Sequence, residues 1–313
     1  MVECTLQDLP HGIRLSCRAT GTRGRPVLMF LHGFPEAAFV WDDLLLHFAR
    51  PEHGGYRCVA PNLRGYADSS SPADVEAYRV KHLVRDIAAL IVAEGAPLAC
   101  LVAHDWGGAL AWSLASQRPE LARRLAIVNS PHPGTFLREL KGNAEQQAAS
   151  AYMNFLVRPD AEALLAADGY RRLFAFFDTP GRSGGAPAWL TEPLRERYRA
   201  VWGTQGTGLR GPCNYYRASP LRPPQPDDPA AAAVELPAAM LNVTLPTLVL
   251  WAMQDQALPP ALLDGLDAWV PALALHRIED ATHWILHENP GLVAAHLGRF
   301  LAADRAAPDA APQ

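Results

Sequence analysis

Residues 101–110 read LVAHDWGGAL, an apolar run of strand length that passes directly into a segment with helical character. Asp105 stands at the junction, and Gly107 and Gly108 would let the helix pack closely against a sheet. A side chain at such a turn points into the crevice beyond the carboxyl ends of the strands, where ligands bind in open α/β sheets. The helix N-terminus favours a carboxylate in its ionised form. The stretch therefore predicts a reactive aspartate or, more simply, a helix cap.

Apolar runs of strand length recur along the chain and alternate with helical segments. Near-continuous apolar runs are typical of strands that are covered on both faces. The alternation therefore predicts an α/β fold with a mostly parallel sheet, right-handed crossovers and flanking helices. The predicted strands are 26–33, 56–62, 97–105, 124–131, 246–253 and 273–279, and the helices between them include 80–95 and 107–119.

The alternation stops in the middle of the chain, where helical segments and loops rich in proline and glycine take over. Because strands resume at 246, this middle part is predicted to be a helical cap inserted into the sheet domain. Its predicted helices are 144–156, 160–177 and 193–202. The predicted division is a first core segment 1–134, the cap 135–238, a second core segment 239–303 and a disordered, Ala/Pro-rich tail 304–313.

Composition restricts the class of protein. The 313 residues are 49% hydrophobic and 19% charged with a net charge of −4, which is typical of a globular protein and unfavourable for nucleic-acid binding. Because no charged and apolar leader and no apolar run of about eighteen residues occurs, we expect a cytoplasmic protein with no membrane segment. The five cysteines include no C-x-x-C pair and are expected to be free thiols.

The stretch LHGFPE (31–36) directly follows a predicted strand. Its turn can aim the backbone N–H of Phe34 into the crevice that Asp105 faces. With the N–H of Trp106, the residue after Asp105, this would make a two-donor oxyanion hole. The alternative is an ordinary loop turn, since glycine and proline are common in loops.

Two further residues follow late strands. Asp255 lies in LWAMQDQAL (250–258), and His283 lies in DATHWILHENP (280–290). An aspartate that binds one imidazole nitrogen allows the other nitrogen to act as a base. His287, four residues further on, is a weaker candidate for the same role.

Together, HGFPE, AHDWGG, WAMQD and ATHW resemble the aspartate-nucleophile branch of the α/β-hydrolase superfamily, and most closely its soluble epoxide hydrolases. The resemblance implies that Asp105 opens an epoxide and forms an ester. His283, oriented by Asp255, would then activate the water that releases a vicinal diol. A carboxylate suits displacement at saturated carbon, whereas a serine alkoxide suits acyl transfer. No metal or organic cofactor is implied.

The resemblance also implies two cap tyrosines that protonate the departing epoxide oxygen. Tyr216 lies in GPCNYYR (211–217), which resembles the family's G-P-x-N-x-Y-R segment, and Tyr152 stands seven residues before Pro159. A phenol is a suitable acid for an alkoxide. The alternative for Tyr152 is a core aromatic, and Tyr215 is easily confused with Tyr216.

Two other functions stay open. Haloalkane dehalogenases share the D-W-G-G turn, but a halide needs no acid, and Phe34 offers no side-chain donor where many of them have asparagine. A non-catalytic ligand-binding homologue is the alternative from another class. The expected partner is a small-molecule epoxide, and the chain is expected to be a monomer or a homodimer. Candidate pocket residues are His104, Pro35, Trp41, Phe155 and Trp284.

Overall fold

The computed structural model describes residues 1–178, 186–204 and 208–303, so the expectation for the tail 304–313 lies outside the described residues. The described part forms an eight-stranded sheet in the order β1-β2-β4-β3-β5-β6-β7-β8. All neighbours from β4 to β8 pair in parallel, and the β1–β2 and β2–β4 pairs are antiparallel. The strands are β1 (Glu3–Asp8), β2 (Arg14–Thr20), β3 (Val27–Leu31), β4 (Arg57–Pro61), β5 (Cys100–His104), β6 (Leu125–Val128), β7 (Thr247–Ala252) and β8 (Leu273–Ile278).

The six predicted strands are therefore confirmed as β3 to β8, whereas β1 and β2 were not predicted. β1 reads ECTLQD and lies exposed at the sheet edge, and β2 reads RLSCRAT, in which polar residues interrupt the apolar ones. An edge pair of this kind needs no continuous apolar run, because water covers part of its surface.

Helices cover both faces of the sheet, so alternate residues of β5 are buried in two different cores. Leu101 and Ala103 point into the core that includes residues of α2 (Val80–Glu94) and α3 (Asp105–Gln117). Cys100 and Val102 point into the opposite core, which includes residues of three other helices. These are α1 (Asp42–Phe48), α10 (Ile285–Glu288) and α11 (Pro290–Ala302).

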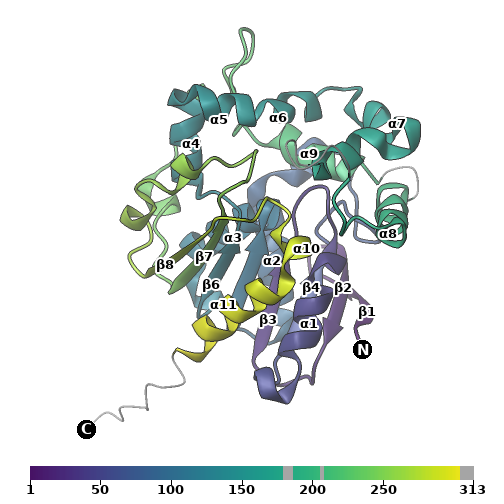
Figure 1. The fold of residues 1–313 in the computed structure, drawn as a ribbon, viewed down its shortest axis with the longest axis vertical. Helices are drawn as coiled ribbons and strands as arrows, with labels where there is room; N and C mark the ends of the chain where they lie inside the picture. Colours follow the sequence, from purple (N-terminus) through teal and green to yellow (C-terminus); the bar gives the residue numbers. More distant parts are fainter. Residues whose placement is uncertain (179–185, 205–207, 304–313) are drawn as a thin grey trace.

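In the described residues between β6 and β7 there are six α-helices, which lie above the sheet in Figure 1. The helix predicted over 144–156 is two helices that meet at Ser150, and the one predicted over 160–177 contains non-helical residues from Ala167 to Tyr170. The boundaries of the cap as a domain stay a prediction. The six are α4 (Pro133–Gly142), α5 (Ala144–Ala149), α6 (Ala151–Leu156), α7 (Ala161–Phe174), α8 (Glu192–Trp202) and α9 (Arg210–Ala218).

Within the described ranges, no helix has the length and apolar character that a membrane span requires.

Candidate active site

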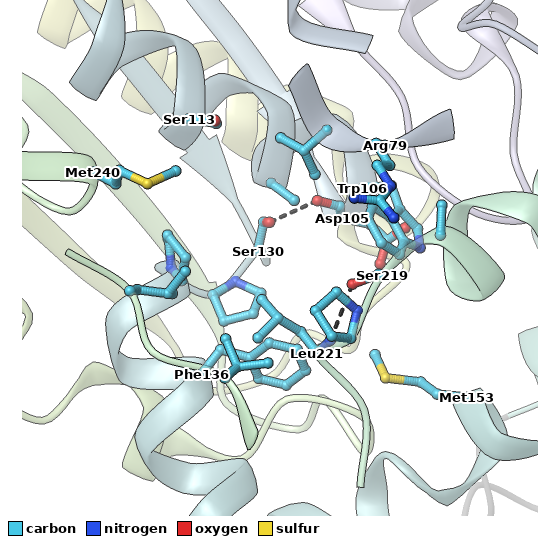
Figure 2. Close-up of a pocket in the computed structure, with 18 of the residues that line it drawn as sticks. Arg79, Asp105, Trp106, Ser113, Ser130, Phe136, Met153, Ser219, Leu221 and Met240 are labelled. Atoms are coloured by element: carbon cyan, nitrogen blue, oxygen red, sulfur yellow. Dashed lines mark hydrogen bonds between the residues drawn. The ribbon is translucent and has the colours of Figure 1, made fainter. Parts of the chain in front are cut away.

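Asp105 is the first residue of α3 and stands in a strained turn directly after β5. Its φ of 49° lies in the left-handed region, which side chains other than glycine rarely adopt. The turn is held from behind, because the Ser130 hydroxyl donates to the Asp105 carbonyl at 2.6 Å (Figure 2). Gly108 allows this approach, since a Cβ there would lie 2.2 Å from the Ser130 Cβ.

The Asp105 side chain faces the turn after β3. The backbone N–H of Phe34 donates to Asp105 Oδ1 at 2.7 Å. Gly33 makes room for the carboxylate, because a Cβ at that position would lie 2.3 Å from Oδ1. The cap position of α3 falls on His104 and not on Asp105. The N–H of Phe34 lies where an oxyanion donor is expected. The matching role of the Trp106 N–H stays a prediction.

His283 lies between two carboxylates. Its Nδ1 is 2.6 Å from Asp255 Oδ2, and its Nε2 is 3.8 Å from Asp105 Oδ2. Burial alone would lower the pKa of His283, but the charge of Asp255, its hydrogen bond and the charge of Asp105 together raise the pKa to about 9. His283 is thus oriented by Asp255, with its second nitrogen toward Asp105.

Asp255 is buried, and both of its carboxylate oxygens accept hydrogen bonds. Its Oδ1 accepts the N–H groups of Ala257 and Leu258 at 2.9 and 3.0 Å. Its Oδ2 accepts the side-chain amide of Asn129 at 2.8 Å in addition to His283. Burial alone would raise the pKa of Asp255, but His283, Asn129 and the Ala257 N–H lower it. Sequence reasoning missed Asn129, although it directly follows β6 as Asp105 follows β5.

The two predicted cap tyrosines lie close together near Asp105. Tyr152 belongs to α6 and Tyr216 to α9, and their ring centroids are 6.0 Å apart. Burial raises the pKa of both phenols, and the negative charge of Asp105 raises each further, which keeps them protonated. Tyr215 is distinct from this pair, because its hydroxyl donates to the Arg64 carbonyl at 3.0 Å.

Two cavities meet at Asp105 and Tyr152, which line both. The first, of about 320 Å³, is called the apolar cavity, and Figure 2 shows part of its wall. The second, of about 410 Å³, is called the polar cavity. The apolar cavity is lined mainly by apolar side chains, among them Phe136, Met153, Leu221, Leu236, Met240 and Leu258. The polar cavity is lined by Asp178, Gln254, Gln256, Thr282 and His283, with Phe34, Tyr216 and Trp284 among its aromatic residues.

Of the candidate pocket residues, only Trp284 lines one of these two cavities. The carbonyl of Pro35 accepts the indole N–H of Trp202, and the ring of Phe155 lies beside the Arg158 guanidinium. Trp41 directly precedes α1 and packs with that helix in the opposite core, where its ring centroid is 5.4 Å from that of Phe30. This corrects the expectation that Trp41 borders the crevice.

His104 is fully buried. It belongs to a cluster around Glu36 that was not predicted from the sequence. Its Nε2 lies 3.0 Å from the carbonyl oxygen of His283, and its Nδ1 lies 3.2 Å from Glu36 Oε2. Glu36 Oε1 lies 2.7 Å from Nε2 of His287 and 3.2 Å from the hydroxyl of Tyr198. His287 therefore faces Glu36, and His283 alone of the two faces Asp255.

Among the described residues, no group of three or more His, Cys, Asp or Glu side chains is arranged to hold a metal ion. The groups around Asp105 are a carboxylate, an imidazole, two phenols and backbone donors. Such a set can carry out nucleophilic displacement and acid–base chemistry.

Comparison with known proteins agrees with this fold. A family model described as alpha/beta hydrolase fold matches residues 26–290. AB hydrolase superfamily protein YfhM of Bacillus subtilis (strain 168) is 33% identical over 284 residues, which are 90% of this chain and 92% of that protein. The chain belongs to the α/β-hydrolase family.

Epoxide hydrolases are prominent among the relatives. Epoxide hydrolase 1 of Caenorhabditis elegans is 32% identical over 291 residues, which are 92% of this chain and 68% of that protein. The structure of the Bacillus megaterium epoxide hydrolase in complex with an inhibitor has a TM-score of 0.84 at 29% identity and covers 95% of this chain and 99% of that chain. A structure of an epoxide hydrolase from metagenomes of hot environments has a TM-score of 0.83 at 36% identity, with 96% and 99% covered. Within the α/β-hydrolases, this chain is a member of the epoxide hydrolase family.

Proposed function

We propose that this protein hydrolyses epoxides to vicinal diols through an ester formed on Asp105. The observation that carries the proposal is the position of the Asp105 carboxylate at the junction of both cavities, with His283 Nε2 at 3.8 Å and Tyr152 lining the same two cavities. A nucleophile, a base and proton donors thus surround one point. The names of the relatives support the same reaction.

In the first half-reaction, an oxygen of Asp105 attacks one epoxide carbon and the bond from that carbon to the epoxide oxygen breaks. Because Phe34 donates to Oδ1, Oδ2 is the oxygen free to attack. The departing alkoxide takes a proton from Tyr152 or Tyr216, and one tyrosine is left as a phenolate. Their raised pKa values keep both phenols protonated until a strong base such as an alkoxide forms.

The second half-reaction needs a neutral His283. While Asp105 is ionised, its charge helps to hold a proton on His283. Esterification removes that charge, so the pKa of His283 falls and its proton can return to the phenolate. Neutral His283 then takes a proton from water, which attacks the carbonyl carbon of the ester. The resulting oxyanion is stabilised by the N–H of Phe34 and by that of Trp106.

When this oxyanion collapses, the bond from the carbonyl carbon to the diol oxygen breaks, and that oxygen takes the proton that His283 removed from water. The new carboxyl group of Asp105 then gives its proton to His283, which restores ionised Asp105 and protonated His283.

Dehalogenation is the alternative that the experiment must separate from this proposal. Purified protein is incubated in parallel with styrene oxide and with 1-chlorobutane, and diol and halide are measured. Diol formation without halide release is expected, because two phenols beside Asp105 suit an alkoxide leaving group. Halide release without diol formation would overturn the proposal, and absence of both products would favour a binding protein.

A further inference from the structure

Tyr198 of the cap helix α8 reaches into the core beneath the candidate active site. Its side chain is fully buried, and its hydroxyl lies 3.2 Å from Glu36 Oε1 and 2.9 Å from His287 Nε2. Glu36 belongs to the turn that also carries Phe34. The contact therefore joins the cap to the loop that provides a predicted oxyanion donor.

The geometry assigns the protons in this contact. Nε2 of His287 lies 2.7 Å from a carboxylate oxygen, which can only accept, so Nε2 carries a hydrogen. The Tyr198 hydroxyl then donates to the same oxygen. Oε1 of Glu36 thus accepts from two donors, one from the cap and one from α10.

The other oxygen of Glu36 faces His104. Oε2 lies 3.2 Å from Nδ1 of His104, but neither atom has a properly oriented hydrogen bond within the described part of the chain. Burial alone would raise the pKa of Glu36, but His104 and His287 lower it, so the carboxylate stays ionised. The two donors at Oε1 are side chains whose hydrogen bonds orient this buried charge.

Glu36 is connected to His283 through His104. Nε2 of His104 donates to the carbonyl of His283 at 3.0 Å, and the two imidazole rings are 4.6 Å apart. A shift of Glu36 would move the carboxylate charge that lies 3.2 Å from His104 Nδ1, and so disturb the imidazole that supports the His283 backbone. Asp105 is held separately by Phe34 and Ser130.

We propose that Tyr198 and His287 are positioning residues that orient Glu36, and that through His104 they align His283 for hydrolysis of the ester. The inference rests on the proposed function, because it concerns the second half-reaction. Docking of α8 on the core would then be required for release of the product, but not for attack on the epoxide. Trp189, whose ring stacks on His287 at 4.4 Å, gives the cap a second contact with the same group.

The test is rapid-quench kinetics with styrene oxide, in which the masses of intact free and alkylated protein are followed with time. Tyr198→Phe removes the hydroxyl and keeps the ring. We expect ester decay to slow about tenfold, as for loss of one hydrogen bond to a charged group, with ester formation unchanged. His287→Gln keeps a neutral donor and should lie close to the wild type, whereas His287→Leu should resemble Tyr198→Phe.

Tyr215→Phe is the matched control, because it also removes a buried hydroxyl that joins the cap to the core. Its ester decay should match the wild type. Equal slowing of formation and decay in Tyr198→Phe, or unchanged decay in a folded Tyr198→Phe protein, would overturn the inference. If wild-type protein forms diol but no ester, the proposed covalent route fails instead, so the two failures are distinguishable.

Discussion

Asn129 donates its side-chain amide, at 2.8 Å, to the Asp255 oxygen that also binds His283. The amide oxygen of Asn129 in turn accepts the backbone N–H of Ala252, the last residue of β7. The residue has a φ of 39° and is fully buried. Asn129 therefore fixes the acid of the predicted triad to the strand that carries it.

Replacement of Asn129 by alanine should impair the ester-hydrolysis step more than ester formation. We expect about a tenfold slower ester decay and a loss of about 2 kcal/mol in the free energy of unfolding, because a buried carboxylate loses a donor. Denaturant unfolding and rapid-quench kinetics measure the two effects. Asn62→Ala is the control, since Asn62 also follows a strand and bonds Ser16 and Ala38 without touching the site. If the rate of ester decay fell equally in both variants, the proposed role of Asn129 would be wrong.

Loss of both Tyr152 and Tyr216 should slow ester formation. Because general acid catalysis contributes about 10²–10⁴-fold, Tyr152→Phe/Tyr216→Phe is expected to lose a factor in that range, with each single variant less affected. Ester formation from styrene oxide is the measurement. Tyr215→Phe controls for loss of a buried hydroxyl in the same helix as Tyr216. A double variant with a near-normal rate would show that another group protonates the epoxide oxygen.

The two cavities predict how substituents on the epoxide are accommodated. Ala218 lines the apolar cavity and Ala149 the polar cavity, so Ala218→Leu and Ala149→Leu are a matched pair that each fill one side. We expect Ala218→Leu to lower kcat/KM about tenfold for 1,2-epoxydecane, whose chain suits an apolar wall, and to spare propylene oxide. Ala149→Leu should affect both substrates similarly. The reverse pattern would place the alkyl chain in the polar cavity.

The rate of ester hydrolysis should depend on pH through His283. The pKa of His283 is raised to about 9 while Asp105 is ionised, and it falls when Asp105 is esterified. Ester decay needs neutral His283. The rate of ester decay should therefore rise with pH and reach a plateau below about pH 9. Quenched-flow measurements from about pH 5.5 to 9.5 test this. A rate that falls with rising pH would mean that His283 acts as an acid in this step.

The same pKa shift predicts a pH dependence of stability. Because the folded-state pKa of His283 lies above its unfolded value of about 6.5, its contribution to stability is complete below pH 6.5 and is lost as the pH rises toward 9.

Residues at strand ends were predictable from the sequence because their signal is local. Asp105, Asp255 and His283 each follow a predicted strand, and the carboxyl ends of parallel strands meet at one edge of the sheet. The site of Trp41 was not predictable in this way, because Trp41 packs with α1 in the opposite core. The residues around Glu36 were also missed, since Glu36 and His287 are 251 positions apart and neither stretch indicates that they meet.

β1 and β2 were missed for a different reason. Their role is set by pairing with each other and with β4, and their polar composition alone does not distinguish an edge strand from a loop.

The most direct test of the covalent route is a single turnover of styrene oxide, with protein in excess, in water enriched in ¹⁸O. If Asp105 forms the ester and water attacks its carbonyl carbon, the label enters the carboxylate of Asp105 and the diol of this first turnover is unlabelled. Peptide mass analysis of the fragment that contains Asp105, together with the mass of the diol, measures both. Label in the diol with none in Asp105 would mean that water attacks the epoxide directly, and the account of Asp105 as the nucleophile would be wrong.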